Sequence, residues 1–179
     1  HSRMSGFRKN SMAAVLSTVV TVIFWLAIVL GTILFVILGI GLLGSLNGGE
    51  IDLPLVEARA EGVPTGRIVA ALVGLVVFAP GIAFVCAQLR KILSTLADGD
   101  PFVPENAPRL TQIAVAIGLI EVIRMCSVLI LAATVDLGEG YVANININLA
   151  VWGAVIVLLI LAQVFKEGTR LREEQKMTI

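Results

Sequence analysis

A run of 35 residues without a charged side chain, residues 12–46, is the feature that most constrains how this chain can fold. About 20 consecutive apolar residues are enough to cross the hydrocarbon core of a bilayer as a helix. The whole chain is 58% hydrophobic and 15% charged, whereas soluble domains are about half apolar and a quarter charged. A disordered chain would be poorer still in apolar residues. The sequence therefore predicts an integral membrane protein.

Four apolar stretches are long enough, or nearly so, to span a membrane. They lie at about 12–46, 68–89, 110–135 and 147–165. The first would rise about 52 Å at 1.5 Å per residue, so we expect it to tilt or to protrude from the bilayer. Residues 90–109 would form a loop and residues 166–179 a tail. Residues 1–3 resemble a cloning remnant, which leaves 4–179 as a single membrane domain with a retained first span rather than a signal peptide.

The basic residues predict the orientation of the spans. Nine of them would share one side of the membrane: Arg8, Lys9, Arg90, Lys91, Arg109, Lys166, Arg170, Arg172 and Lys176. The other side would hold Arg59 and Arg67 with six acidic residues. Because cytoplasmic segments carry the excess of Lys and Arg, both termini are expected in the cytoplasm. The predicted fold is an all-α bundle of four transmembrane helices in a bacterial inner membrane.

Two segments on the opposite side show alternating apolar and polar residues. They are residues 50–55 and 141–148. A period of two is typical of a half-buried strand. We expect the two segments to pair as a small extracytoplasmic β cap, with Pro54 at an edge or bulge. The cap would be either a structural lid joining two helix hairpins or a sensing element.

Composition also limits the chemistry. The formal net charge is zero, so the chain is not expected to bind nucleic acid directly. Its single histidine, His1, belongs to the presumed remnant, which argues against a histidine-based metal site, haem ligand or general base. We find no recognisable nucleophile–base pair. The expectation is a protein that is not an enzyme and that uses no metal or cofactor.

Two charges near the middle of the third span are the costly feature of the sequence. Each charged residue at the centre of a bilayer costs at least about 2.5–3.5 kcal/mol. Glu121 and Arg124 are three residues apart, so they share a helix face and can pair. Pro80 of the second span would lie at a similar depth, and it deprives the Val76 carbonyl of its helical donor.

We therefore predict an intramembrane polar cluster. Its members are Glu121, Arg124, Val76, Pro80 and Gly81, with Thr21 and Thr32 contributing if they face inward. Three interpretations remain open. The pair fixes helix register only, it biases a kinked two-state helix, or Glu121 carries a proton or cation in a dimeric transporter. Arg124 weakens the last interpretation, because a neighbouring cation favours the charged carboxylate whereas a proton carrier must titrate.

The loop and the tail carry the most specific patterns. In LSTLADGDPFVPENA (residues 93–107), a turn at 98–101 would end the second helix and Asn106 would cap the third. This segment resembles the central loop of a bacterial family of four-helix inner-membrane proteins of unknown function. FKEG (165–168) followed by LREEQ (171–175) is similar to that family's C-terminal signature.

The resemblance implies a partner rather than a reaction. Members of that family are often encoded beside a helix-turn-helix regulator of the Xre/Cro type. It thus implies a non-enzymatic membrane regulator or sensor that modulates such a cytoplasmic protein. Our candidate partner-binding residues are Asp98, Asp100, Phe102, Glu105, Glu173 and Glu174. The alternative is a small-solute or proton-coupled transporter that uses Glu121, and in either case the chain is a candidate homo-oligomer in the lipid bilayer.

Overall fold

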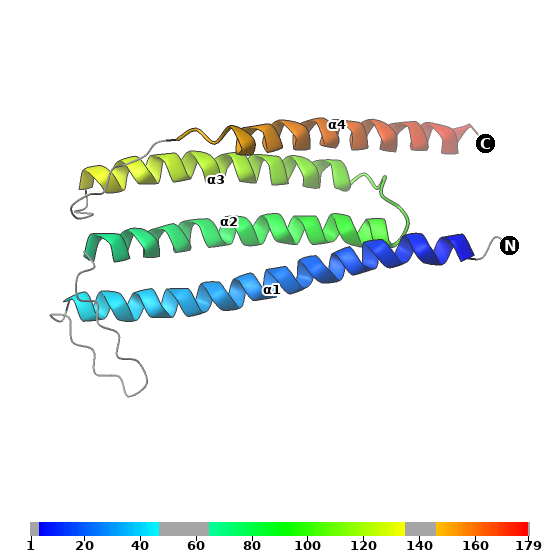
Figure 1. Cartoon of the computed structure of the whole chain (residues 1–179). Helices are drawn as coiled ribbons and strands as arrows, with labels where there is room; N and C mark the ends of the chain where they lie inside the picture. The colour runs from blue at the N-terminus through cyan, green and yellow to red at the C-terminus, as the bar shows by residue number, and fades with distance from the viewer. Residues whose placement is uncertain (1–3, 47–64, 135–145, 179) are drawn as a thin grey trace. The chain divides into compact units, whose positions relative to one another are not determined.

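The computed structural model describes residues 4–46, 65–134 and 146–178, and every regular element in this part of the chain is a helix (Figure 1). The helices are α1 (Met4–Leu46), α2 (Thr65–Ala97), α3 (Asn106–Thr134) and α4 (Leu149–Met177). All four are long and apolar enough to cross a membrane. The expectation of an all-helical, multi-pass membrane protein is confirmed at this level. As expected, α2 continues well past residue 89 before it ends.

The predicted β cap lies mostly outside the described residues, which exclude 50–55 and 141–145. The remaining residues of its second segment form no strand. Asn148 instead begins α4 as its N-cap, because its side-chain oxygen accepts hydrogen bonds from the backbone N–H groups of Ala150 and Val151. An asparagine in this role satisfies donors that have no partner within the helix.

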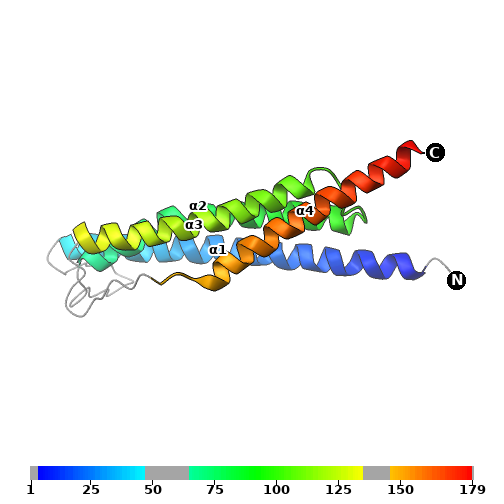
Figure 2. The same ribbon diagram turned by 90° about the horizontal axis from the view of Figure 1, so that it is seen from above.

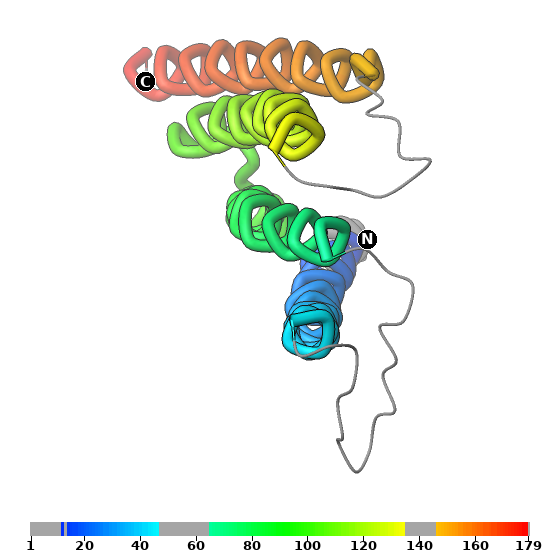
Figure 3. The backbone as a smooth tube through the Cα atoms, turned by 90° about the vertical axis from the view of Figure 1, so that its left-hand side faces the viewer, coloured from blue at the N-terminus to red at the C-terminus, as the bar shows by residue number. Residues whose placement is uncertain are grey.

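The chain divides into two compact units. The first consists of His1–Trp25, Gly81–Glu121 and Asn148–Ile179, and the second of Leu26–Pro80 and Val122–Ile147. In the first unit α3 lies between α2 and α4 (Figures 1 and 3), and α4 crosses α3 obliquely (Figure 2). Side chains from all three helices form its apolar core. These are Ile92 of α2, Leu110 and Ile113 of α3, and Ala162 of α4.

Small residues allow the helices of the first unit to approach closely. A Cβ atom at Gly118 would lie 3.7 Å from the Trp152 ring of α4, and Ala114, one turn away, is fully buried. A Cβ at Gly81 would lie only 2.8 Å from the Ile120 side chain, so a larger residue there would require that side chain to move. Close backbone approach of this kind is how membrane helices commonly associate.

The second unit contains fewer buried contacts. Its α1 and α2 segments meet where the Gly41 backbone faces Ile68, which is buried, and where the hydroxyls of Ser45 and Thr65 form a hydrogen bond. Around Gly74, the atoms nearest a Cβ belong to Phe78 of the same helix. No residue in the most apolar stretch of α1 is buried. Most of the α1 surface is therefore available to lipid.

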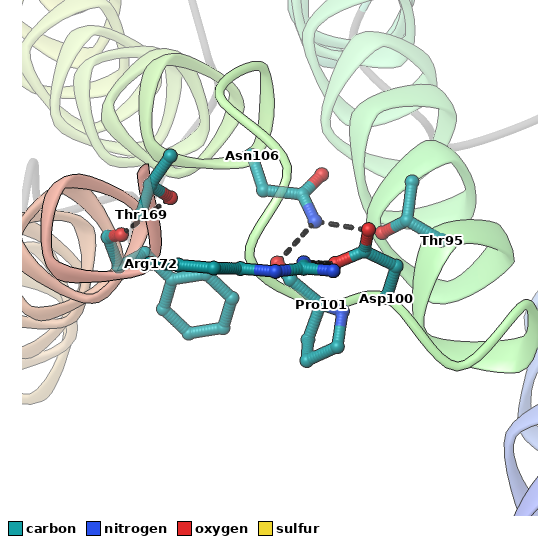
Figure 4. A network of polar contacts seen from close by, with 7 residues as sticks. Thr95, Asp100, Pro101, Asn106, Thr169 and Arg172 are labelled. Atoms are coloured by element: carbon teal, nitrogen blue, oxygen red, sulfur yellow. Dashed lines mark hydrogen bonds and ion pairs between the residues drawn. The ribbon is translucent and has the colours of Figure 1, made fainter. Parts of the chain in front are cut away.

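The α2–α3 connection is closed by a glycine and a buried asparagine. Gly99 has φ 83°, a left-handed conformation that favours glycine, and the N–H of Asp100 bonds to the Thr95 carbonyl at 3.1 Å. This Schellman-type ending confirms the predicted turn. Asn106 is fully buried. Its amide donates to the Thr95 hydroxyl at 2.6 Å and to the Pro101 carbonyl at 2.9 Å (Figure 4).

The prediction that Asn106 caps α3 is wrong. Asn106 is the first residue of the helix, and its side-chain oxygen accepts a hydrogen bond from Arg109 rather than from a backbone N–H. The carbonyl of Glu105 receives the first backbone bond, from the Arg109 N–H at 3.2 Å. The asparagine side chain faces the connection because Thr95 and Pro101 offer its amide two acceptors. It joins the two helices rather than ending one of them.

We expect Asn106→Ala to lower the free energy of unfolding by about 1–3 kcal/mol, because the change leaves buried polar groups without their partner. Thermal unfolding of the detergent-solubilised protein measures the effect. Gln175→Ala is the matched control, since Gln175 is an exposed amide on α4, and its effect should stay within about 0.5 kcal/mol. Equal stability of the two variants would contradict the role assigned to Asn106.

Candidate functional site

The two segments that carry the family resemblance meet in the first unit. Phe102 of the α2–α3 connection packs against Phe165 of α4, with 5.6 Å between ring centroids. A Cβ at Gly168 would lie 2.6 Å from the Phe102 ring. Only glycine at this position therefore leaves room for the ring against the α4 backbone. We call this contact, formed by Asp100, Phe102, Phe165, Gly168 and Arg172, the loop–α4 contact.

An ion pair completes the loop–α4 contact. The guanidinium of Arg172 binds the carboxylate of Asp100, and both side chains are 40% exposed (Figure 4). Next to Gly168, the buried hydroxyl of Thr169 donates to the Phe165 carbonyl of its own helix at 2.9 Å. An ion pair with this exposure contributes little stability by itself. Its effect is to orient the connection on α4, while the Phe102 ring, itself 39% exposed, packs against Phe165 and the backbone at Gly168.

The structure divides the six candidate partner-binding residues into two groups. Asp100 and Phe102 are engaged within the chain by the loop–α4 contact. Asp98, Glu105, Glu173 and Glu174 are exposed and belong to the same unit. A carboxylate oxygen of Glu174 lies 3.7 Å from Nε of Arg170, and the Arg170 guanidinium also pairs with Glu167. The sequence did not reveal that Arg172 and Gly168 receive the loop, because both look like ordinary residues of a charged helix.

A groove runs along α3 and α4 beside the loop–α4 contact. Its volume is about 1040 Å³. Near the contact it is lined by Pro104, Ala107 and Pro108, together with the charged residues Lys166, Glu167, Arg170 and Glu173 of α4. Toward the apolar part of α4 it is lined by Gln112, Leu159, Ala162 and Gln163. No sequence pattern indicated this groove, because it forms only where two distant segments pack.

The residues of the predicted intramembrane cluster are divided between the two units. In the first unit, Glu121 is 5% exposed. Gly81 packs against Ile120, which directly precedes Glu121 in the sequence. In the second, Arg124 is partly buried and donates to the Asn146 carbonyl at 2.8 Å. Pro80 lies inside α2, and Val76, one turn before it, is 57% exposed. The cluster as a whole stays a prediction.

Two further polar features bear on the spans. The hydroxyls of Thr21 and Thr32 donate to carbonyls four residues earlier in α1, so their hydrogen bonds are made within their own helix. Gln88 of α2 is buried and donates to Gln112 of α3 at 2.9 Å. This amide pair was missed from the sequence, although a glutamine inside an apolar span is itself a signal of an interhelical hydrogen bond.

In the described residues, no three His, Cys, Asp or Glu side chains lie close enough together to hold a metal ion. The polar side chains of the loop–α4 contact and of the groove offer hydrogen bonding and ion pairing instead. They lie near the end of the helices where α2, α3 and α4 are joined by polar contacts. The site is therefore best described as a candidate interaction surface.

Comparison with known proteins identifies a family for this chain. A family described as a protein of unknown function, DUF2975, matches residues 52–179. The chain belongs to this family. The matched region contains α2, α3 and α4 and both segments of the loop–α4 contact, whereas α1 precedes it. No curated protein and no solved structure matches the chain significantly.

We expect Gly168→Ala to displace the Phe102 ring and to destabilise the protein by about 1–3 kcal/mol, the usual cost of overpacking. Hydrogen exchange of residues 98–105 should become faster. Gly153→Ala is the matched control, because a Cβ at Gly153 has open space around it and alanine favours helix. Unchanged exchange in Gly168→Ala would show that the ring does not hold the connection on α4.

Proposed function

We propose that this chain is a non-enzymatic membrane regulator whose loop and C-terminal helix hold a cytoplasmic helix-turn-helix protein. The observation that supports this proposal best is the loop–α4 contact, in which the two segments of the resemblance meet through Phe102 and Gly168. Asp98, Glu105, Glu173 and Glu174 remain exposed in the same unit. A rigid contact with exposed carboxylates around it is a suitable platform for a protein partner.

Charge complementarity favours a DNA-binding protein as that partner. Such proteins carry basic patches that neutralise phosphates, and exposed carboxylates can bind the same patches. A single exposed ion pair contributes only about 0–1 kcal/mol, so several carboxylates must act together. Occupation of the basic surface would compete directly with DNA. The resemblance implies a regulator of the Xre/Cro type.

The proposed orientation follows from the basic residues. The basic residues that the structure describes at the predicted cytoplasmic ends of the spans all belong to the first unit. They include Arg90, Lys91, Arg109 and Lys166. The positive-inside rule then places both termini in the cytoplasm of a bacterial inner membrane. Residues 50–55 and 141–145 would form a β cap on the other side, where a signal could be received.

A route from the membrane to the loop is available along α3. Glu121, Gly118, Ala114 and Leu110 are all buried and recur at helical spacing, and this buried stripe ends at Asn106. We propose that a change at Glu121 and Arg124 shifts α3 and thereby moves the connection that Asn106 holds. A packed helix with two discrete positions is a recognised means of coupling two sites.

We expect Glu173→Lys combined with Glu174→Lys to lower recovery of the partner about tenfold, because two attractive contacts become repulsive. Crosslinked pull-down of the tagged protein from its native host, read by mass spectrometry, measures the recovery. Glu57→Lys with Glu61→Lys makes the same change in charge on the predicted opposite side and should have no effect. Equal recovery from both variants would remove the tail from the proposal.

Transport is the second candidate, because Glu121 is an acidic residue buried within a helix that can cross a membrane. If Glu121 carries a proton or cation, Glu121→Gln should abolish flux in liposomes while the protein still folds. Glu105→Gln, at an exposed carboxylate outside α3, should leave the flux unchanged. Absence of flux with the parent protein would end this alternative.

A further inference from the structure

The groove between α3 and α4 changes character along its length. On α4 its lining begins with Leu159 and Ala162, continues with Gln163, and ends with Lys166, Arg170 and Glu173. Apart from the adjacent pair Ala162 and Gln163, these α4 residues follow one another at intervals of three or four, so they lie on one face of the helix. One end of the groove is therefore apolar and the other is charged.

The groove also lies where α4 leaves the apolar part of its sequence. No charged residue occurs between residues 149 and 165, whereas seven of the next eleven residues, 166–176, are Lys, Arg or Glu. The change from apolar to charged residues marks the boundary between hydrocarbon and headgroups for either orientation of the chain. A molecule that fills the groove must then be amphipathic, and phospholipid is the amphipathic molecule present at that depth.

The charged end of the groove offers groups of both signs in a fixed order. Lys166 is exposed and forms no ion pair with any residue that the structure describes. Arg170 follows about 6 Å further along the axis, and Glu173 about 4.5 Å beyond it. The Arg170 side chain is 63% exposed, so its pairs with Glu167 and Glu174 are readily exchanged for a ligand.

We propose that the groove binds a phospholipid whose headgroup carries a phosphate and a primary ammonium. The phosphate binds Lys166 and Arg170, and the ammonium, one ethylene unit further out, binds Glu173. The acyl chains extend toward Leu159. The side-chain amides of Gln112 and Gln163 lie between the two ends and can donate to the ester carbonyls.

The balance of charge selects this headgroup over the two common alternatives. The lining contains two cations, Lys166 and Arg170, and two carboxylates, Glu167 and Glu173. Basic pockets between membrane helices bind anionic lipids, but the headgroup of phosphatidylglycerol ends in a neutral glycerol, which forms no ion pair with Glu173. A quaternary ammonium cannot donate a hydrogen bond to Glu173. The proposal shares Glu173 with the proposed partner surface, but lipid binding itself requires no protein partner.

Native mass spectrometry of the delipidated full chain in detergent tests the proposal. The probes are phosphatidylethanolamine, phosphatidylcholine and phosphatidylglycerol with identical acyl chains, in equal amounts. We expect phosphatidylethanolamine adducts to exceed each of the others by about threefold, the effect of one exposed charge pair. Lys166→Glu should lower the adducts of all three lipids, because they share the phosphate, whereas Glu173→Gln should lower the ratio to about one. Lys91→Glu, an exposed lysine on α2 outside the groove, should preserve it.

A crosslinking measurement locates the lipid without relying on stability. Phosphatidylethanolamine with a photoactivatable acyl chain should label the peptide that contains Leu159 and Ala162 in the parent protein and in Lys91→Glu, but less in Lys166→Glu. Equal adducts of all three lipids, a preference for phosphatidylglycerol, or labelling that does not depend on Lys166 would each overturn the proposal. The proposal would also be overturned if a second copy of the chain covered the groove and excluded the lipid.

Discussion

Apolar helix surfaces gain little free energy by packing together in lipid. The contacts between these helices follow from this constraint. The surrounding hydrocarbon is as apolar as the side chains, so helices associate through close backbone approach and polar bonds. In this chain both devices converge on α3. Gly81 of α2 approaches Ile120, Gly118 receives Trp152 of α4, and Gln88 bonds to Gln112. α1 lacks buried residues in its most apolar stretch. Because the close contacts and the amide bond all involve α3, it is the helix against which α2 and α4 pack in the first unit.

The same helix connects the interior of the protein to its candidate interaction surface. Asn106 begins α3 and holds the α2–α3 connection through Thr95 and Pro101. That connection presents Phe102 to the α4 backbone at Gly168. The position of the loop–α4 contact therefore depends on α3, even though its residues belong to other segments. A perturbation that moves α3 would be expressed at this contact, which is the physical basis of the proposed regulatory role.

Sequence patterns predicted the local features well and the roles of single side chains less well. The helices and the turn at Gly99 follow from apolar runs and from a residue that adopts positive φ. Asn106 was predicted to be a cap, yet its amide finds acceptors in Thr95 and Pro101. Phe102 looked like a partner-binding residue because its receiving position, Gly168, lies far away in the sequence. Such pairings depend on tertiary packing, which a one-dimensional pattern does not contain.

The amino-acid sequence by itself determined that this is a membrane protein with four long helices. A long apolar segment in a bilayer must satisfy its backbone hydrogen bonds internally, and a helix does so without any neighbour. Only the tertiary structure decided that Asp100 meets Arg172, that Phe102 lies on Gly168, and that α3 and α4 enclose a groove beside Lys166. Helical periodicity defines a face, but the neighbour of that face depends on how the helices cross and how closely small residues let them approach.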